Sequence, residues 1–429
     1  MTPVVLSSVV FLIVLVAILL ERGDRAIIAI AGAAVMVGLG TALGFYDEQQ
    51  AIASLDLQTL GLLLAMMILV ALLRPTGLLE ALAAWTAKLS GGKPALLLVM
   101  LGAVTAGLSM MLPNVTVIVL IAPLTILVAE VLAISPVPLL VAEAVLSNVG
   151  GVGTLIGDPP NMLIGSAAGL SFNDFLLHAL PVALVTIPVM CLLLLFLYRR
   201  QLKARGAGST ALEGLRPAEA LHDRKTAFRV LAVLGCGLLF FLLQEALGLS
   251  SSLIALSMAA VALVWIQPPM EELLKRIDWQ VLIFFLALFV LVGGMESAGT
   301  LELVAQWMAG PLGGNSVLAA VGVLWLTAIS SAVVDNVPIT AAMIPVVLAL
   351  GDHGIAIGPL WWALAFGAGF GGNGTIIGSA SGIIVAELSA RTPEAITSRT
   401  WVRAGPLALI LSCAIATLAL VVAYPFFAR

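Results

Sequence analysis

The stretch 147-SNVGGVGTLIGDPPN-161 interrupts a long hydrophobic run of the chain. Mostly apolar residues lie on both sides of it, over 137–146 and 162–170. Between them are four glycines, two asparagines, two prolines and the acid Asp158. Glycine lets a backbone unwind, and a proline pair suits the first turn of a new helix. The stretch therefore predicts a helix that breaks and then restarts.

The composition is typical of a membrane protein. Of the 429 residues, 62% are hydrophobic and only 10% are charged, against about 25% charged in soluble domains. Apolar runs such as Val4–Leu20, Leu57–Leu73 and Leu180–Tyr198 are long enough to cross the hydrocarbon layer as helices. No basic segment precedes Val4–Leu20, so we expect a retained span rather than a signal peptide. The sequence shows no basic stripe for nucleic acid and no Cys/His cluster, and we predict no metal, no cofactor and no enzymatic activity.

An internal repeat organises the chain. When the sequence is shifted by 222 residues, twelve of the thirty positions in 56–85 are identical. At the same offset 113-PNVTVIVLIAP-123 lies on 335-DNVPITAAMIP-345. At an offset of 221 the opening stretch lies on 371-GGNGTIIGSASG-382. The interrupted segment is therefore present twice, which predicts a two-fold architecture.

We expect an all-α polytopic membrane protein with two inverted-topology repeats, each with a re-entrant helical hairpin and a discontinuous transmembrane helix. The repeats would comprise residues 1–198 and 226–429, joined by a cytoplasmic linker over 199–225. The predicted spans are 4–20, 26–45, 57–74, the broken 137–170, 176–198, 226–246, 249–266, 279–295, the broken 357–386 and 404–424. The predicted hairpins are 94–131 and 316–350, and the predicted interfacial segments are 76–90 and 300–310. Because five is an odd number of crossings, the second half would be upside down relative to the first.

The basic residues predict the orientation. In this topology eighteen of the nineteen lysines and arginines fall on one side, and only Arg429 falls on the other. Such a bias marks the cytoplasmic face. We therefore expect a multi-pass protein of the inner (plasma) membrane, in contact with lipid, with cytoplasmic basic loops and both termini outside.

The interrupted segments predict a binding site. Non-helical backbone survives at membrane depth only where protein surrounds it or where it lines a polar cavity, and paired broken helices recur in secondary transporters. The residues expected to bind a solute are Asn114, Thr116, Asn148, Gly150, Gly153, Thr154, Asn336, Asn373, Gly374 and Thr375. A carboxylate at this depth is costly, so Asp158 and Asp335 are expected to carry a coupling ion or proton, although each could instead cap a helix. Glu143 leads into the first break and is expected to face the cavity.

These motifs also carry a family resemblance. GTLIGDPPN at 153–161, AGLSFNDF at 168–175, the repeated Asn-Val pairs and GNGTIIGSASG at 372–382 resemble the ArsB/NhaD branch of the ion transporter superfamily. The GDPPN motif is similar to that of the P-protein-like subgroup. The resemblance implies inverted repeats, hairpins, broken helices and assembly as a homodimer. In the dicarboxylate relatives the hairpin tips read Ser-Asn-Thr, and of that triplet only the asparagine is present in both tips of this chain.

Three functions are weighed. The first is export of arsenite or antimonite, driven by protons or membrane potential through alternating access, with a separate ATPase subunit needed for any ATP coupling. Cys191 and Cys413 are repeat mates that could bind arsenic, but we interpret them as small apolar residues. The second is Na⁺/H⁺ antiport, in which Asp158 and Asp335 alternate between the two ions. The third, an ion channel, is disfavoured because the chain has no repeated selectivity filter and no voltage-sensor arginines.

Overall fold

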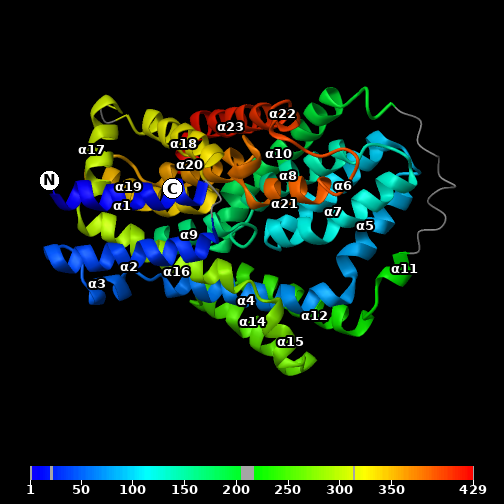
Figure 1. Ribbon diagram of the computed structural model, residues 1–429, viewed down its shortest axis with the longest axis horizontal. Coiled ribbons are helices and arrows are strands. Elements are labelled where there is room, and N and C mark those ends of the chain that lie inside the picture. Colours follow the sequence, from blue (N-terminus) through cyan, green and yellow to red (C-terminus); the bar gives the residue numbers. More distant parts are fainter. Residues whose placement is uncertain (1, 20–22, 204–216, 313–314, 429) are drawn as a thin grey trace.

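The chain is described by a computed structural model over residues 2–19, 23–203, 217–312 and 315–428 (Figure 1). All regular elements within these residues are helices. The predicted all-α polytopic fold is therefore confirmed. Residues 204–216 of the predicted linker lie outside the described part, as do Arg22 and Arg429 of the charge count.

Eleven of the described helices precede the linker, counting one short 3₁₀ helix. They are α1 (Thr2–Leu19), α2 (Arg25–Leu43), α3 (Glu48–Ala53), α4 (Leu57–Leu73), η1 (Arg74–Thr76), α5 (Leu78–Leu89), α6 (Pro94–Ser109), α7 (Asn114–Val131), α8 (Val137–Val152), α9 (Pro159–Ala168) and α10 (Phe172–Leu197).

The remaining described helices follow residue 216. They are α11 (Pro217–Ala220), α12 (Arg224–Leu242), α13 (Gln244–Leu247), α14 (Ser251–Ile266), α15 (Met270–Arg276), α16 (Trp279–Ser297), α17 (Thr300–Leu312), α18 (Ser316–Val333), α19 (Asn336–Asp352), α20 (Gly358–Gly371), η3 (Ile376–Gly378), α21 (Ala380–Ser389), α22 (Ser398–Trp401), α23 (Gly405–Val422) and α24 (Tyr424–Phe427).

Eight helices of the described chain are long and apolar enough to cross a membrane. They are Arg25–Leu43, Leu57–Thr76, Asn114–Val131, Phe172–Leu197, Arg224–Leu242, Trp279–Ser297, Ser316–Val333 and Ser398–Val422. The helices at the predicted spans 4–20 and 249–266 are shorter. Two of the eight, α7 and α18, belong to the predicted hairpins, because length and composition alone do not separate a hairpin arm from a full span.

Side-chain caps explain where the long helices begin. The repeat mates Asp56 and Asp278 precede α4 and α16, and each carboxylate accepts hydrogen bonds from the first-turn backbone N–H groups. Asp24 does the same for α2 and Asn315 for α18. An acceptor at this position satisfies N–H groups that have no partner within the helix. The same signal in both halves therefore starts corresponding helices.

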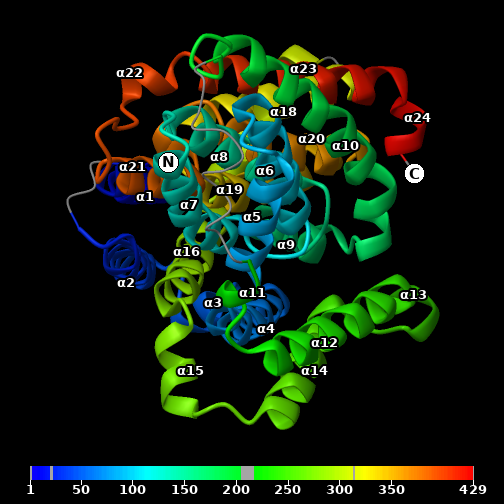
Figure 2. The same cartoon turned by 90° about the vertical axis from the view of Figure 1, so that its right-hand side faces the viewer.

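The two broken helices form the centre of the molecule. Every residue of α8 is buried, as is every residue of α20 from Pro359 to Gly371. Helices α6, α7, α10 and α21 pack against α8, and α18, α19 and α23 pack against α20. Helices α2, α4, α12, α14 and α16 lie together to one side of this group (Figure 2). The first break is buried from Gly153 to Asp158, whereas Ile377 in the second break is 38% exposed. The non-helical backbone of the first break is therefore surrounded by protein, as the membrane interior requires.

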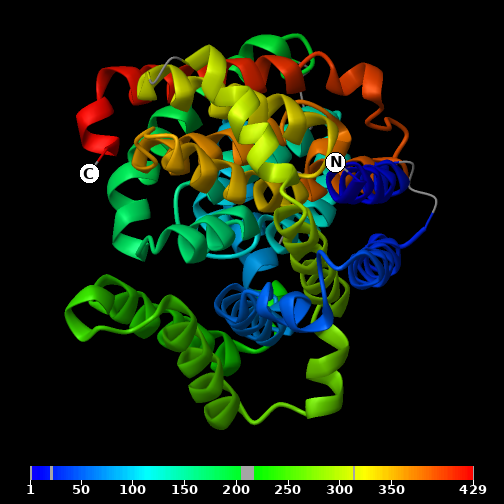
Figure 3. The ribbon, with the colours of Figure 1, turned by 90° about the vertical axis from the view of Figure 1, so that its left-hand side faces the viewer.

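Corresponding elements of the two halves lie at opposite ends of the long axis. Figure 1 shows α5 and α7 toward one end and α17 and α19 toward the other. The marked N- and C-termini lie in the same half of that view, far from α11 at the edge of the linker. Seen end-on, the two termini lie on opposite flanks of the molecule (Figure 3). The inverted repeats and the side of the membrane that each end faces stay predictions.

Glycines allow each broken helix to approach its hairpin closely. A Cβ at Gly150 of α8 would lie 2.2 Å from the carbonyl oxygen of Ala106 in α6. A Cβ at the repeat mate Gly371 of α20 would lie 2.5 Å from the carbonyl oxygen of Ala328 in α18. Both distances fall well below van der Waals contact, and backbone cannot move aside as a side chain can. Each half therefore needs a glycine at this crossing.

We predict that Gly150→Ala lowers the midpoint of thermal unfolding of the purified protein, because the added methyl group forces α8 away from α6. Overpacking of this kind typically costs about 1–3 kcal/mol. The matched control is Gly107→Ala in α6, where an added Cβ meets nothing within 4 Å. A midpoint for Gly150→Ala equal to that of the control would contradict this account of the crossing.

Candidate functional site

Both hairpin tips and both helix breaks meet in one place. Helix α7 begins at Asn114 and α19 begins at Asn336, so both asparagines stand at the tips of hairpins that come from opposite ends (Figure 1). Helix α8 ends at Val152 and α9 begins at Pro159, which confirms the predicted break. The site is built from segments of both halves of the chain.

Asn161 holds the first break in shape. Its side-chain N–H₂ group donates to three backbone carbonyl oxygens, those of Gly151 at 3.0 Å, Val152 at 3.1 Å and Thr154 at 2.7 Å. These carbonyls have no helical partner because the helix has ended. The hydroxyl of Thr154 donates to the carbonyl of Met110 and so links the break to the first hairpin. Asn161 therefore supports the backbone and does not face a ligand.

The second break is held by equivalent groups. The hydroxyl of Thr375 donates to the carbonyl of Ala332 at 2.5 Å, as its repeat mate Thr154 does in the first half. The hydroxyl of Ser379, the repeat mate of Asp158, accepts from the backbone N–H of Gly382 and caps α21. In the second half this position thus has the ordinary capping role.

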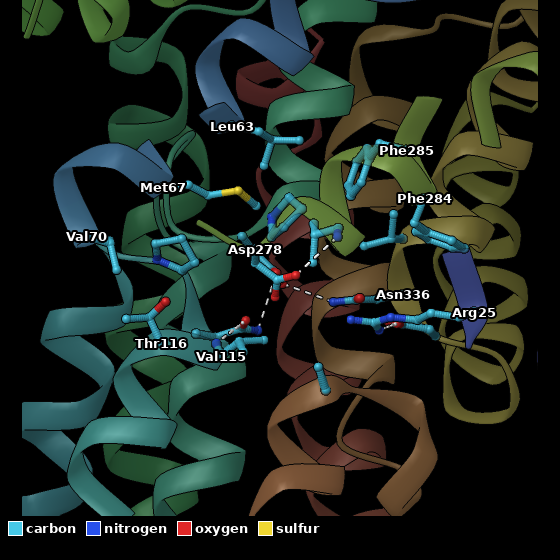
Figure 4. A pocket seen from close by; sticks show the side chains of 18 of the residues that line it. Arg25, Leu63, Met67, Val70, Val115, Thr116, Asp278, Phe284, Phe285 and Asn336 are labelled. Carbon is cyan, nitrogen blue, oxygen red and sulfur yellow. Dashed lines mark hydrogen bonds and ion pairs between the residues drawn. The ribbon is translucent and has the colours of Figure 1, made fainter. Parts of the chain in front are cut away.

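Asp158 differs from its mate, because its carboxylate does not cap the following helix. It is 2% exposed and makes no side-chain cap to α9. Instead the amide groups of both tips donate to it, Asn114 to Oδ1 at 3.3 Å and Asn336 to Oδ2 at 3.1 Å (Figure 4). Among the described residues no lysine or arginine forms an ion pair with it. The capping interpretation is therefore wrong for Asp158.

Asn148 extends this network to the second break. Its side-chain oxygen Oδ1 accepts a hydrogen bond from the side-chain N–H₂ group of Asn114 at 3.1 Å. Its own side-chain N–H₂ group donates to Asn373 Oδ1 and to Ser379 Oγ, both at 2.9 Å. The amide nitrogen of Asn373 is buried and has no hydrogen-bond partner. A buried donor without a partner is costly. The network thus ends in one N–H₂ group that is free to bind an acceptor.

Asp335 forms an ion pair with the side chain of Arg25. The Arg25 guanidinium lies 3.3 Å from Asp335 Oδ2, and both side chains are partly exposed. The same guanidinium lies 5.9 Å from the ring centre of Phe284 in α16 (Figure 4). Like Asp158, Asp335 makes no side-chain cap to the helix after it. The two acids of the site therefore differ, since one is paired with an arginine and the other is bound only by neutral amides.

A cavity of about 120 Å³ opens between these groups. Among its lining residues are Asp158, Asp335 and both tip asparagines, and Thr116 lies across it from Asn336 (Figure 4). The opposite wall is formed by α4 and α16, with Leu63, Met67 and Phe285 among the lining residues. Pockets for drug-sized ligands are larger, about 300–1,000 Å³. The cavity has the size for an ion or a small oxyacid.

The predicted site residues divide into two groups. Those that line the cavity are Asn114, Thr116, Asp158, Asp335 and Asn336. Those that lie behind it, in the network or at the helix crossings, are Asn148, Gly150, Gly153, Thr154, Asn373, Gly374 and Thr375. Glu143 and the three cysteines do not line the cavity.

Sequence reasoning missed several lining residues. They are Arg25, Leu63, Met67, Arg74, Arg276, Asp278, Phe284 and Phe285. One feature of the sequence drew attention to Arg25, because this charged residue stands directly before the predicted span 26–45. Its partner Asp335 is 310 positions away, and no motif in the sequence connects the two. Leu63, Met67, Phe284 and Phe285 belong to α4 and α16, which look like ordinary spans, and Arg74, Arg276 and Asp278 lie in short segments at the ends of these helices.

The matching family covers most of the chain. Residues 15–367 match the profile of the family described as citrate transporter. The chain belongs to the citrate transporter family. Membership in this family, within the ion transporter superfamily, makes the chain a multi-pass membrane transporter, whereas assignment to the ArsB/NhaD branch stays a prediction.

Curated relatives extend over nearly the whole chain. A 46 kDa membrane protein of Mycobacterium leprae is 35% identical over 96% of this chain and 97% of its own length. The magnetosome protein MamN of Paramagnetospirillum magneticum is 32% identical over 82% of this chain and 81% of its own length. The human P protein is 30% identical over 86% of this chain but only 54% of its own length. The expected similarity to the P protein is thus confirmed.

A solved structure has a similar fold. The YdaH transporter of Alcanivorax borkumensis, described as having an unusual topology, superposes with a TM-score of 0.59. The superposition covers 99% of this chain and 98% of that one, at 17% sequence identity. At this identity the likeness establishes the fold and leaves the transported solute open.

We predict that Asn161→Ala lowers thermal stability, because three carbonyl groups of the break lose their donor. Leaving a buried polar group without a partner costs about 1–3 kcal/mol. The control is Asn173→Ala, which removes one exposed hydrogen bond, from Asn173 to the carbonyl of Leu242. Comparison of the thermal unfolding midpoints of both purified variants tests the prediction, and equal midpoints would refute the supporting role of Asn161.

Proposed function

We propose that the chain is a secondary active transporter that exchanges protons for a monovalent cation, with Asp158 as the ion carrier. The observation that supports this most is the surroundings of the Asp158 carboxylate. It lies in the cavity with only amide N–H groups as partners, whereas Asp335 is paired with Arg25. A carboxylate at membrane depth needs compensation. A proton or a bound cation such as Na⁺ would supply it.

The exchange would use the two forms of one carboxyl group. With a proton bound, Asp158 is neutral and can cross the membrane region with its segment at low electrostatic cost. With the proton released, the carboxylate and the amide oxygens around it offer hard ligands of the kind that suit Na⁺. Alternating access would move the hairpins and broken helices relative to α2, α4, α12, α14 and α16.

Export of arsenite or antimonite is the second candidate. Arsenite near neutral pH is largely the neutral acid As(OH)₃, which binds through hydrogen bonds. The starts of α7 and α19 at the cavity offer N–H donors for its oxygens. Asp158 would then carry the coupling proton. Cys191 and Cys413 are buried away from the cavity, so arsenic would find no thiol ligand there.

Transport by the purified protein in liposomes tests these candidates. Sodium, arsenite and citrate are offered separately under an imposed pH gradient, and citrate is included because the family description names it. Sodium-driven proton flux supports the proposal. Arsenite movement without that flux supports the second candidate, and citrate movement alone would refute both.

We predict that Asp158→Asn reduces ion-coupled transport to the level of empty liposomes while the amount of folded protein is retained. The amide keeps the size of the side chain but binds neither a proton nor a cation. Asp352→Asn is the matched control, because Asp352 is exposed at the far end of α19. Transport by Asp158→Asn equal to that of the control would exclude Asp158 as the ion carrier.

A further inference from the structure

Glu143 is a buried acid that the proposed site does not use. It lies in the middle of α8, its residue is 0% exposed, and it does not line the cavity. The hydroxyl of Thr125 in α7 donates to Glu143 Oε1 at 2.5 Å. Glu143 Oε2 is buried and has no hydrogen-bond partner. Half of this carboxyl group is therefore unsatisfied.

Within the described part of the chain, no cation compensates Glu143. The helices that pack against α8 are α6, α7, α10, α20 and α21. Their titratable residues are Glu130, Asp174, His178, Cys191 and Glu387. Glu130 and Glu387 are exposed acids, and no ion pair between Glu143 and any described residue is present. An ionised carboxylate in this place would be an isolated charge, so a protonated acid fits these surroundings far better.

The fold itself does not require polar side chains at the positions of Glu143 and Thr125. At the repeat offsets of 221 and 222, Glu143 corresponds to Leu364 or Ala365, and Thr125 corresponds at 222 to Val347. All three mates are apolar, although α18, α19 and α20 pack together as α6, α7 and α8 do. A structural role alone would be served better by apolar residues. The pair Glu143–Thr125 is therefore a feature of the first half that calls for a functional explanation.

Glu143 lies close to the Asp158 network along α8. Ser147 follows one turn later on the same face. Its hydroxyl donates to the carbonyl oxygen of Ala144 at 2.9 Å and lies 3.2 Å from Ser381 Oγ in α21. The next residue, Asn148, bonds Asn114, which in turn bonds the Asp158 carboxylate. Hydroxyl and amide groups thus line the part of α8 between the two acids.

We propose that Glu143 is a second proton-binding site, which takes up one proton and releases it once in each transport cycle. The carboxylate gains the proton to become the neutral acid, and the same proton is later lost, so the charge balances over the cycle. The aqueous solution supplies the proton and receives it again. This inference rests on the proposed ion-coupled function, but its first test does not need any transported solute.

The first test is infrared spectroscopy of the purified protein, titrated from about pH 5 to about pH 10. A protonated carboxylic acid has its own C=O stretching band. We expect a component of this band that disappears with rising pH in the wild type and in Asp158→Asn but is missing in Glu143→Gln, so that any band of Asp158 is told apart from it. Thr125→Val, which keeps the acid but removes its hydrogen-bond donor, should shift the pH at which this component disappears. A component that stays constant over the whole range, or identical titrations of the wild type and Glu143→Gln, would overturn the proposal.

The second test is the number of protons moved per cargo ion, measured in liposomes from the gradients at which net flux stops. Glu143→Gln should move one proton fewer per cargo ion than the wild type. The matched control is Glu130→Gln in α7, which removes an exposed acid and should leave the ratio unchanged. An unchanged ratio in Glu143→Gln would refute the proton-carrying role. If the wild type moves no cargo, the proposed function fails, and the infrared titration still decides whether Glu143 exchanges a proton.

Discussion

The carboxylate of Asp158 joins three segments that no other group in the site brings together. It belongs to the first break, and its two amide donors belong to the tips of different hairpins. A buried carboxylate needs such donors, because apolar surroundings offer nothing in place of water. The hydrogen bonds therefore hold both tips against the break, and Asn148 carries the same network on to the second break. The arrangement of the centre follows from satisfying this one charge.

The residues that support the helix crossings and breaks are repeated in both halves of the chain, whereas the buried acids are not. The glycines at the helix crossings, the threonines at the breaks and the tip asparagines occur in both halves. The acids do not: Asp158 corresponds to Ser379, Asp335 to Pro113 and Glu143 to an apolar residue. Ser379 shows what the position requires structurally, since it caps α21. Where the first half has an acid that does not cap, the requirement comes from something other than the fold.

Much of this structure is readable from the sequence, because the signals are local and repeated. Apolar runs, capping aspartates and the glycine-proline interruption determine where helices begin and end, and the repeat showed that the interruption occurs twice. The residues that face the cavity were less readable. Asn148 and Thr154 lie within the same motif as Asp158, yet they support the site from behind. Asn148 still belongs to α8, and Thr154 lies in the unwound segment, where spacing in the sequence does not determine the direction of a side chain. Arg25 and Phe284 come from helices that are ordinary spans in the sequence, and only the tertiary packing places them beside Asp335.

The pairing of Arg25 with Asp335 makes Asp158 and Asp335 unequal. A cation arriving at Asp335 would have to displace a guanidinium that is tethered to α2 and lies over Phe284. A cation arriving at Asp158 displaces only the amide N–H groups of Asn114 and Asn336, whose side chains can turn their oxygens toward it instead. The second exchange breaks no ion pair, so on the proposed mechanism the first cation binds at Asp158. Arg25 also connects α2, outside the central group, to the tip of the second hairpin. If that tip moves in the proposed cycle, it must either carry the ion pair with it or break it. The electrostatic cost of the transport cycle therefore depends on Arg25 as well as on the acids.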